Sequence, residues 1–120
     1  MNRELVLGAL ARHRELFNAG DREGWLANLT DEPLLEEPVG GPIRRGREHF
    51  ARVFDVTHQS PGVVLPEPDI VVVSGREAAI SFKAPTPGGR LTDVVEIFTV
   101  DDDGRVVGVR TFIDPEVLLG

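Results

Sequence analysis

Cysteine and tyrosine are both absent from the 120 residues of this chain, and tryptophan occurs once. Without cysteine there is no disulfide scaffold, no thiolate nucleophile and no cysteine-ligated metal centre. Lysine and arginine together number 13 against 20 aspartates and glutamates, which gives a net charge of −7 without a long basic run. Because binding to nucleic acid requires a positive surface that displaces counterions from phosphates, we expect no nucleic-acid partner.

Long apolar runs are missing as well. Arg3 and Glu4 place charges in the N-terminal stretch, which has no apolar run of the length of a signal peptide or a membrane span. We therefore expect a cytoplasmic protein without a membrane partner. With 41% hydrophobic residues, the chain has the size and composition of a globular domain, so we expect residues 1–120 to form a single domain.

The first half of the chain has the pattern of helices. Apolar residues recur at helical spacing over residues 3–19, and Gly20 follows in a position that suits a helix C-terminal cap. Asp21 is a candidate N-cap for a second, short helix. The core face of that short helix is predicted to consist of Trp25, Leu26 and Leu29. A third helix is predicted from about Arg47 to His58.

The second half changes to the pattern of β-strands. Runs of β-branched or alternating residues are separated by turns rich in proline, glycine and aspartate. The predicted extended segments are Leu34–Glu37, Val63–Leu65, Ile70–Val73, Ala78–Lys83, Leu91–Val100 and Arg105–Ile113. Short turns connect strands as hairpins, so we expect a mostly antiparallel sheet. Helices followed by a β-meander predict an α+β domain whose helices cover one face of a curved sheet.

Glu96 interrupts an apolar face of the predicted strand Leu91–Val100. In an extended strand, its neighbours on the same face are Thr92, Val94, Phe98 and Val100. If this face is buried, loss of hydration raises the pKa of the carboxyl group, and a neutral acid can donate a hydrogen bond to a developing oxyanion. The alternatives are that the face points to solvent or that Glu96 belongs to a cross-strand ion pair.

Two further polar positions break the apolar pattern. Glu36 and Glu37 are adjacent in extended chain before Pro38 and point to opposite sides, so one of them can enter a cavity as a general base. The alternative is a solvated strand end. His13 lies on the apolar stripe of the first helix, where a histidine is more often a core residue with satisfied hydrogen bonds than a catalytic group.

Other catalytic and binding patterns are missing. His49 and His58 lie on different faces of the predicted third helix, and no His-x-x-x-His pair occurs, so a metal site has little support. None of the three serines, Ser60, Ser74 and Ser81, lies in a Gly-x-Ser-x-Gly motif. The glycine pairs lie in turns rather than between a strand and a helix, which gives no phosphate loop. We expect neither a metal nor a cofactor.

Three segments carry a family resemblance. They are Phe17–Leu26 (FNAGDREGWL), Leu35–Gly40 (LEEPVG) followed by Arg45–Glu48 (RGRE), and the closing strand and turn Glu96–Gly104. With these segments in this order and spacing, the chain resembles the ketosteroid isomerases of the nuclear transport factor 2 superfamily over nearly its whole length. The resemblance implies a cone-shaped α+β fold, with a curved antiparallel sheet wrapped by three helices around an apolar cavity, often as a homodimer.

The resemblance also implies a reaction. In ketosteroid isomerases, which use no cofactor, a carboxylate moves a proton from C4 to C6 of a β,γ-unsaturated 3-ketosteroid through a dienolate. A tyrosine and a protonated carboxylic acid hold the oxyanion. By position, the base is Glu37, the acid donor is Glu96, and His13 stands in the place of the tyrosine. Candidates for the apolar wall that binds the substrate are Leu29, Phe54, Phe82, Phe98 and Phe112.

All three polar positions differ from the residue that is commoner in that family. Glu replaces Asp twice, which keeps the charge and adds a methylene in a site where a small misplacement is costly. A neutral imidazole at His13 donates one hydrogen bond, whereas an imidazolium would pair with an ionised Glu96 and titrate with it.

Other functions of the same fold stay open. A SnoaL-like polyketide cyclase would use the same acid–base pocket. An epoxide hydrolase of this fold would need an Asp-Arg-Asp set, to which Arg110 and Asp114 could contribute. A non-catalytic protein that binds a hydrophobic ligand is the third alternative, which the absence of tyrosine favours. In each case the expected partner is a hydrophobic small molecule, such as a steroid or a polyketide.

Overall fold

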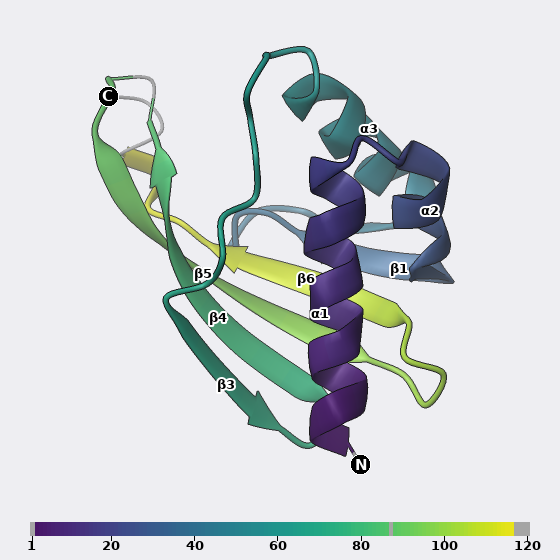
Figure 1. Cartoon of the computed structure of the whole chain (residues 1–120). Helices are drawn as coiled ribbons and strands as arrows, with labels where there is room; N and C mark the ends of the chain where they lie inside the picture. Colours follow the sequence, from purple (N-terminus) through teal and green to yellow (C-terminus); the bar gives the residue numbers. More distant parts are fainter. Residues whose placement is uncertain (1, 87, 117–120) are drawn as a thin grey trace.

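Three helices lie on one side of a curved sheet in the computed structural model, which describes residues 2–86 and 88–116 (Figure 1). The elements are α1 (Asn2–Asn18), α2 (Arg22–Ala27), β1 (Leu29–Glu36), β2 (Ile43–Arg45), α3 (Arg47–Thr57), β3 (Ile70–Ser74), β4 (Glu77–Pro85), β5 (Leu91–Val100) and β6 (Val106–Phe112). The strand order across the sheet is β2-β1-β6-β5-β4-β3. This architecture confirms the predicted α+β fold with a curved sheet and three covering helices.

The helix boundaries follow the capping signals of the sequence. Gly20 has a φ of 72°, a left-handed conformation that glycine adopts without strain, and it ends α1. The Asp21 carboxylate accepts a hydrogen bond from the Gly24 backbone N–H at 2.9 Å and so begins α2. The buried stripe of α1 consists of Val6, Ala9, His13 and Phe17. Through this stripe, α1 packs against β3, β4 and β5, while α3 packs against β1.

Leu29 does not belong to the second helix, and that prediction is wrong. The preceding residue, Asn28, is buried, and its side-chain amide donates to the carbonyl of Ala9 at 3.1 Å and accepts from Arg12 Nε at 3.0 Å. The Asn28 carbonyl accepts a hydrogen bond from Val106 N–H at 2.8 Å. These bonds end α2 and direct the chain into the sheet, so β1 begins at Leu29 rather than at Leu34.

The expectation of a mostly antiparallel sheet is confirmed, with one parallel pair. β1 and β6 are parallel neighbours, and their register shifts between Leu29 and Leu34. Pro33 lies in this shift, and proline has no N–H to donate to a partner strand. β2 follows the Gly40–Pro42 turn and pairs antiparallel with β1. Sequence analysis missed β2, because a three-residue strand is too short to show alternation.

The segment Val63–Leu65 is not a strand, and that prediction is also wrong. It belongs to the irregular connection formed by residues 58–69, which runs from α3 to β3 (Figure 1). Pro61, Pro66 and Pro68 remove hydrogen-bond donors from this connection. Instead of a strand partner, the Leu65 backbone bonds the side-chain amide of Asn18, with its N–H donating at 2.7 Å and its carbonyl accepting at 2.9 Å. The helix end of α1 thus holds Leu65 over the sheet.

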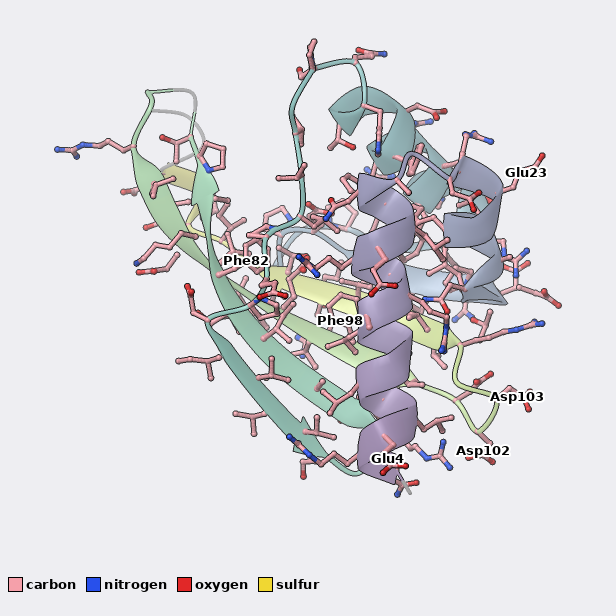
Figure 2. The ribbon with its side chains drawn as sticks, viewed as in Figure 1. Glu4, Glu23, Phe82, Phe98, Asp102 and Asp103 are labelled. Atoms are coloured by element: carbon pink, nitrogen blue, oxygen red, sulfur yellow. The ribbon has the colours of Figure 1, made fainter. Side chains whose placement is uncertain are left out.

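The core lies between the helices and the concave face of the sheet. Figure 2 shows Phe82 of β4 and Phe98 of β5 on the side of the sheet that faces α1. On the helix side of the core, aromatic rings of the three helices pack edge to face or tilted against one another, with centroid distances of 5.5 to 6.0 Å. These rings are Phe17, Trp25, Phe50 and Phe54. Within residues 2–86 and 88–116, no helix combines the length and apolarity needed to span a membrane.

We expect Asn28→Ala to lower the free energy of unfolding by about 1–3 kcal/mol, because it leaves Arg12 Nε without its partner and removes the bond to Ala9. Urea denaturation followed by Trp25 fluorescence measures the change. Glu15→Ala, an exposed position of α1, is the control and should change the value by less than about 0.5 kcal/mol. Equal losses in the two variants would contradict a structural role for the Asn28 amide.

Candidate active site between the sheet and α3

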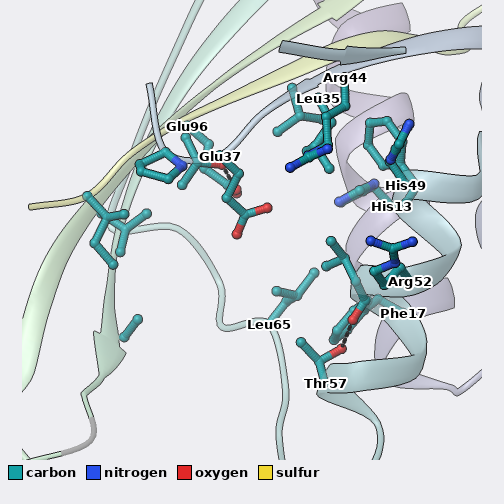
Figure 3. A pocket seen from close by; sticks show the side chains of 18 of the residues that line it. His13, Phe17, Leu35, Glu37, Arg44, His49, Arg52, Thr57, Leu65 and Glu96 are labelled. Carbon is teal, nitrogen blue, oxygen red and sulfur yellow. Dashed lines mark hydrogen bonds between the residues drawn. The ribbon is translucent and has the colours of Figure 1, made fainter. Parts of the chain in front are cut away.

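A cavity of about 500 Å³ lies between the concave face of the sheet, α1 and α3 (Figure 3). This volume is in the range of sites that bind small organic molecules. Its apolar lining residues include Phe17, Leu35, Phe50, Val53, Leu65, Phe82, Val94, Val109 and Ile113. Its polar lining residues include His13, Glu37, Arg44, His49, Arg52, Glu96 and Thr111. The structure therefore brings His13, Glu37 and Glu96 to one cavity, as the resemblance to the ketosteroid isomerases implies.

The register of β5 places Glu96 in the middle of the concave face. Glu96 is paired with Ile80 of β4 and with Thr111 of β6, and residues opposite one another in an antiparallel sheet share a face. Thr111 is buried, and its hydroxyl group donates to Glu96 Oε2 at 2.9 Å. Sequence analysis missed Thr111. The available signal was its alternation with Val109 and Ile113, which makes it a polar residue in an apolar row.

Burial raises the pKa of Glu96 to about 7. The hydrogen bond from Thr111 favours the ionised form and opposes this shift, whereas the negative charge of Glu37 adds to it. Glu96 forms no ion pair among the residues that the structure describes, so both alternatives raised for it, a solvent-facing position and a cross-strand ion pair, are wrong. A substantial share of Glu96 is a neutral acid near pH 7.

Glu36 and Glu37 point to opposite sides of the chain at the end of β1. Glu36 accepts from Arg110 Nε at 2.9 Å and from the Gly40 backbone N–H at 3.2 Å on the convex side. These two bonds, led by that from Arg110, lower the pKa of Glu36. Glu37 lines the cavity, where loss of hydration raises its pKa, although the residue is exposed by surface area and its carboxylate points into the open cavity (Figure 3). Glu37 is therefore the residue of this pair that can act inside the cavity.

His13 reaches the cavity from α1 as a neutral imidazole. Its ring lies between Trp25 and Phe98, at centroid distances of 5.1 and 5.0 Å, and burial lowers its pKa to about 4. Among the described residues, its Nδ1 atom has no hydrogen-bond partner, and no bond joins it to Glu96. The alternative of an imidazolium at His13 paired with an ionised Glu96 is therefore wrong, because desolvation keeps the ring uncharged at neutral pH. His13 is also not a core histidine with satisfied hydrogen bonds.

Trp25 lines the cavity and carries a buried polar atom, unpaired among the described residues, that the sequence pattern did not indicate. Its side chain is buried and lines the cavity, and its Nε1–H has no acceptor within the described part of the chain. An indole N–H is a donor only, and this one is enclosed by protein atoms. Apolar spacing had assigned Trp25 to the core face of a helix. That assignment says where the ring lies but not where the N–H points.

The predicted apolar wall is only partly at the cavity surface. Phe82 lines the cavity, and Phe98 lines a second, smaller cavity of about 250 Å³. The two cavities share His13, Leu65, Phe82 and Glu96 in their walls. Leu29 and Phe54 are buried behind the surface and do not line either cavity, because Leu29 lies at the start of β1 and Phe54 stacks on His58 at 3.8 Å.

Phe112, Arg110 and Asp114 also lie away from the cavity. Phe112 is 39% exposed on the convex face beside Val95, and Arg110 Cζ lies 5.4 Å from its ring centroid. Arg110 is engaged by Glu36, and Asp114 is exposed. The Asp-Arg-Asp set of an epoxide hydrolase is therefore not formed from these residues. No three of the described histidines, aspartates and glutamates converge to hold a metal ion.

A curved sheet with helices on its concave side and an acid-lined apolar cavity defines the nuclear transport factor 2-like class of proteins. Within this class, the sequence profile of the SnoaL-like domain family matches residues 10–109. The chain belongs to the SnoaL-like domain family.

Sequence and structural relatives are consistent with this membership. A steroid Δ-isomerase of Nocardioides simplex is 29% identical over 113 residues, which cover 92% of this chain and 90% of that protein. The epoxide hydrolase/cyclase-like enzyme SalBIII, with a role in pyran ring formation in the polyether salinomycin, superposes with a TM-score of 0.81 at 21% identity and covers 98% of this chain and 97% of its own.

Two further solved structures share the fold. A putative polyketide cyclase of Xanthomonas campestris pv. campestris has a TM-score of 0.78 at 21% identity, with coverage of 97% of this chain and 95% of its own. A computationally designed binder of 17-OHP has a TM-score of 0.79 at 21% identity, with coverage of 94% and 93%. These structural similarities show the fold, and the natural relatives named here are enzymes of isomerase and cyclase type.

Glu96→Gln should stabilise the protein increasingly as pH rises from about 4.5 to about 7. In this range folded Glu96 holds a proton that unfolded Glu96 has lost, so rising pH favours the unfolded wild type, whereas Gln stays neutral. We expect the difference in unfolding free energy to grow by roughly 1–3 kcal/mol between about pH 5 and about pH 8. The opposite contribution of His13 is present in both proteins and cancels.

Urea denaturation at the two pH values measures this difference, with Glu15→Gln on the exposed face of α1 as the control. The control variant should change the free energy of unfolding by the same amount at both pH values. If the difference in unfolding free energy between Glu96→Gln and the wild type does not change with pH, a buried, protonated Glu96 is contradicted.

Proposed function

We propose that this protein is a cofactor-free acid–base enzyme that isomerises a β,γ-unsaturated 3-ketosteroid, or a similar hydrophobic ketone, to its conjugated form. One observation carries the proposal: two carboxyl groups with raised pKa values and a neutral imidazole meet in one largely apolar cavity. The relative from Nocardioides simplex, a steroid Δ-isomerase, supports this reaction class. The cavity volume of about 500 Å³ accommodates a fused-ring substrate.

Glu37 acts as the base. As a carboxylate, it removes the proton at C4, between the carbonyl group and the double bond, and the electron pair moves onto the carbonyl oxygen as a dienolate. The protonated Glu37 then delivers that proton to C6, the double bond shifts into conjugation, and the carboxylate is restored. The raised pKa of Glu37 increases its basicity toward a weakly acidic C–H, and its accessible carboxylate can reach a bound ring.

Glu96 and His13 hold the dienolate oxygen. Glu96 donates from its neutral carboxyl group, which burial maintains near neutral pH. His13 donates from its neutral imidazole, whose buried Nδ1 atom has no hydrogen-bond partner among the described residues. Because Glu37 must be ionised while Glu96 is protonated, the two acids divide the roles of base and donor between them, and their titrations are coupled.

The second candidate function is that of a SnoaL-like polyketide cyclase. It is favoured by the family itself and by the cationic side chains on the α3 side of the cavity, which suit a substrate with acidic groups. The same roles for Glu37 and Glu96 would then serve ring closure. Enone formation from a steroid substrate favours the isomerase over the cyclase. Binding of a steroid or a polyketide without turnover supports the non-catalytic alternative.

We further propose that the protein forms a homodimer through the convex face of the sheet. Val95 and Phe112 form an exposed cross-strand pair there, 38% and 39% accessible respectively. Exposed apolar groups that are adjacent on a sheet face favour association with a second copy. Sedimentation equilibrium of the purified chain measures the stoichiometry.

Glu37→Gln should lower kcat for a β,γ-unsaturated 3-ketosteroid by about a hundred- to ten-thousandfold, because an amide cannot accept the proton. Absorbance of the conjugated enone follows the reaction. Glu36→Gln, the adjacent acid on the opposite side of the strand, is the matched control and should keep most of the activity. In the wild type, kcat/KM should rise as Glu37 ionises and fall above about pH 7 as Glu96 loses its proton. A rate unchanged by Glu37→Gln excludes this base.

His13→Tyr tests the oxyanion donor. A phenol at this position supplies the hydrogen bond that the resembled family uses, while His13→Phe keeps an aromatic ring without a donor. We expect the Tyr variant to exceed the Phe variant in kcat by about a hundredfold, with similar KM values. Enone absorbance measures both variants, and thermal melting controls for folding. Equal rates would show that position 13 donates nothing to the transition state.

A further inference from the structure

The α3 side of the cavity carries charges that the proposed proton transfer does not use. Arg44 of β2 and His49 and Arg52 of α3 line the cavity. Figure 3 shows these three side chains on the opposite side of the cavity from Glu37 and Glu96. The cavity is therefore polarised, with its acids toward the middle of the sheet and its cations toward the sheet edge and α3.

The register of β2 directs Arg44 inward. Arg44 is paired with Leu35 of β1, and Leu35 is paired with Val109 of β6, so the three residues form one row across the concave face. Both apolar members of this row line the cavity. All three residues of β2 are exposed, and Ile43, 65% exposed, lies on the opposite face of the strand from Arg44. β2 thus places Arg44 on the cavity face and Ile43 on the opposite face, the reverse of the usual pattern for a strand that only covers a core.

Arg52 extends from the same side of α3 as His49. Residues three apart on a helix are neighbours on its surface, and each of the two comes directly before a residue of the core, Phe50 or Val53. Asp55, the nearby acid of this helix, is engaged in a bidentate pair with Arg22 at 2.9 and 3.2 Å. Within the described residues, neither Arg52 nor Arg44 takes part in an ion pair or a side-chain hydrogen bond.

The acids of the cavity do not neutralise these arginines. Neither guanidinium affects the raised pKa values of these acids: burial raises the pKa of Glu37, and burial and the charge of Glu37 raise the pKa of Glu96 against the opposing bond from Thr111. His49 lies beside Glu48, with 3.6 Å between Nε2 and Oε1. Below about pH 7, with Glu96 protonated and His13 neutral, two guanidinium groups face one carboxylate, Glu37. These three side chains, all of which are exposed, thus give the cavity wall one excess positive charge in a chain whose net charge is −7.

We infer that Arg44 and Arg52 bind the carboxylate group of a hydrophobic acid, whose apolar body lies on the sheet beside Glu37 and Glu96. This inference deepens the proposed function and rests on it, since the same cavity would hold the reacting ring. The substrate class is a polycyclic or polyketide-like ketone that carries a carboxylate at the end remote from the carbonyl group.

A carboxylate suits this side of the cavity in geometry and in charge. A guanidinium group presents paired N–H donors in a plane that matches the two oxygens of a carboxylate. A monoanion balances the single excess positive charge, whereas a phosphate dianion would leave the cavity negative beside Glu37. The remaining wall near these cations is apolar, through Leu35, Phe50 and Val53, and suits the hydrocarbon part of such an acid.

The test compares a steroid acid with its neutral ester. Isothermal titration calorimetry measures binding of 3-oxochol-4-en-24-oic acid and of its methyl ester to the full-length chain, at low and at high salt. We expect the acid to bind at least about tenfold more tightly than the ester, a preference that added salt reduces. Arg44→Gln and Arg52→Gln should each lower the affinity for the acid by about tenfold and leave the affinity for the ester within about twofold.

Arg45→Gln is the matched control. Arg45 is the next residue of β2, pairs with Leu34 and does not line the cavity, so its loss changes the net charge equally without touching the ligand. We expect it to keep the preference for the acid and the enone-forming rate. If one of the arginine variants fails to fold, as thermal melting reports, charge reversal at the other position (Arg44→Glu or Arg52→Glu) should abolish the preference.

Three results would overturn the inference: equal binding of acid and ester, equal losses for all three arginine variants, or no binding of either compound. The rate of enone formation from a neutral 3-ketosteroid by the wild type, measured in parallel, tests the proposed function separately. Turnover without acid preference refutes only the carboxylate site. Acid preference without turnover refutes only the isomerase.

Discussion

The carboxyl group of Glu96 lies on the concave face of the sheet without a counter-ion in the described structure, and the electrostatics of the cavity depend on this position. Three strands determine it, because Glu96 is held between Ile80 and Thr111 in the middle of the sheet. A carboxylate there loses hydration on both sides, and the single bond from Thr111 compensates only part of that loss. The group therefore keeps its proton up to about pH 7.

Loss of hydration also explains why the His13 imidazole stays neutral. Its ring is enclosed by Trp25 and Phe98, and a charged imidazolium would lack both water and an acidic partner. Burial thus favours the neutral form of both Glu96 and His13 inside the cavity, and a neutral carboxyl group or imidazole can donate a hydrogen bond to a ligand. Glu37, when ionised, and the arginines on the α3 side bring formal charge to the cavity wall.

Much of the fold could be predicted from local signals. Gly20 and Asp21 mark the junction of the first two helices because a left-handed cap and an N-cap carboxylate act within a few residues. Strand Leu91–Val100 has the predicted limits, since ten alternating residues between two turns leave little freedom. The wrong assignments, Leu29 and Val63–Leu65, depend on distant partners. Asn28 reaches Ala9 of α1, and Leu65 takes its hydrogen bonds from Asn18.

The sequence by itself determined which residues break the apolar pattern, because spacing along a helix or a strand is a local property. Glu96 and His13 were identifiable on that basis, and Glu37 followed from its place before Pro38. Tertiary structure alone decided that these groups share a cavity with Thr111 and Trp25, and that Arg44 enters it while Ile43 does not. The physical reason is that the pKa of a cavity residue depends on its burial, and the face to which a charged side chain points depends on strand register. Both arise only when segments far apart in the chain pack together.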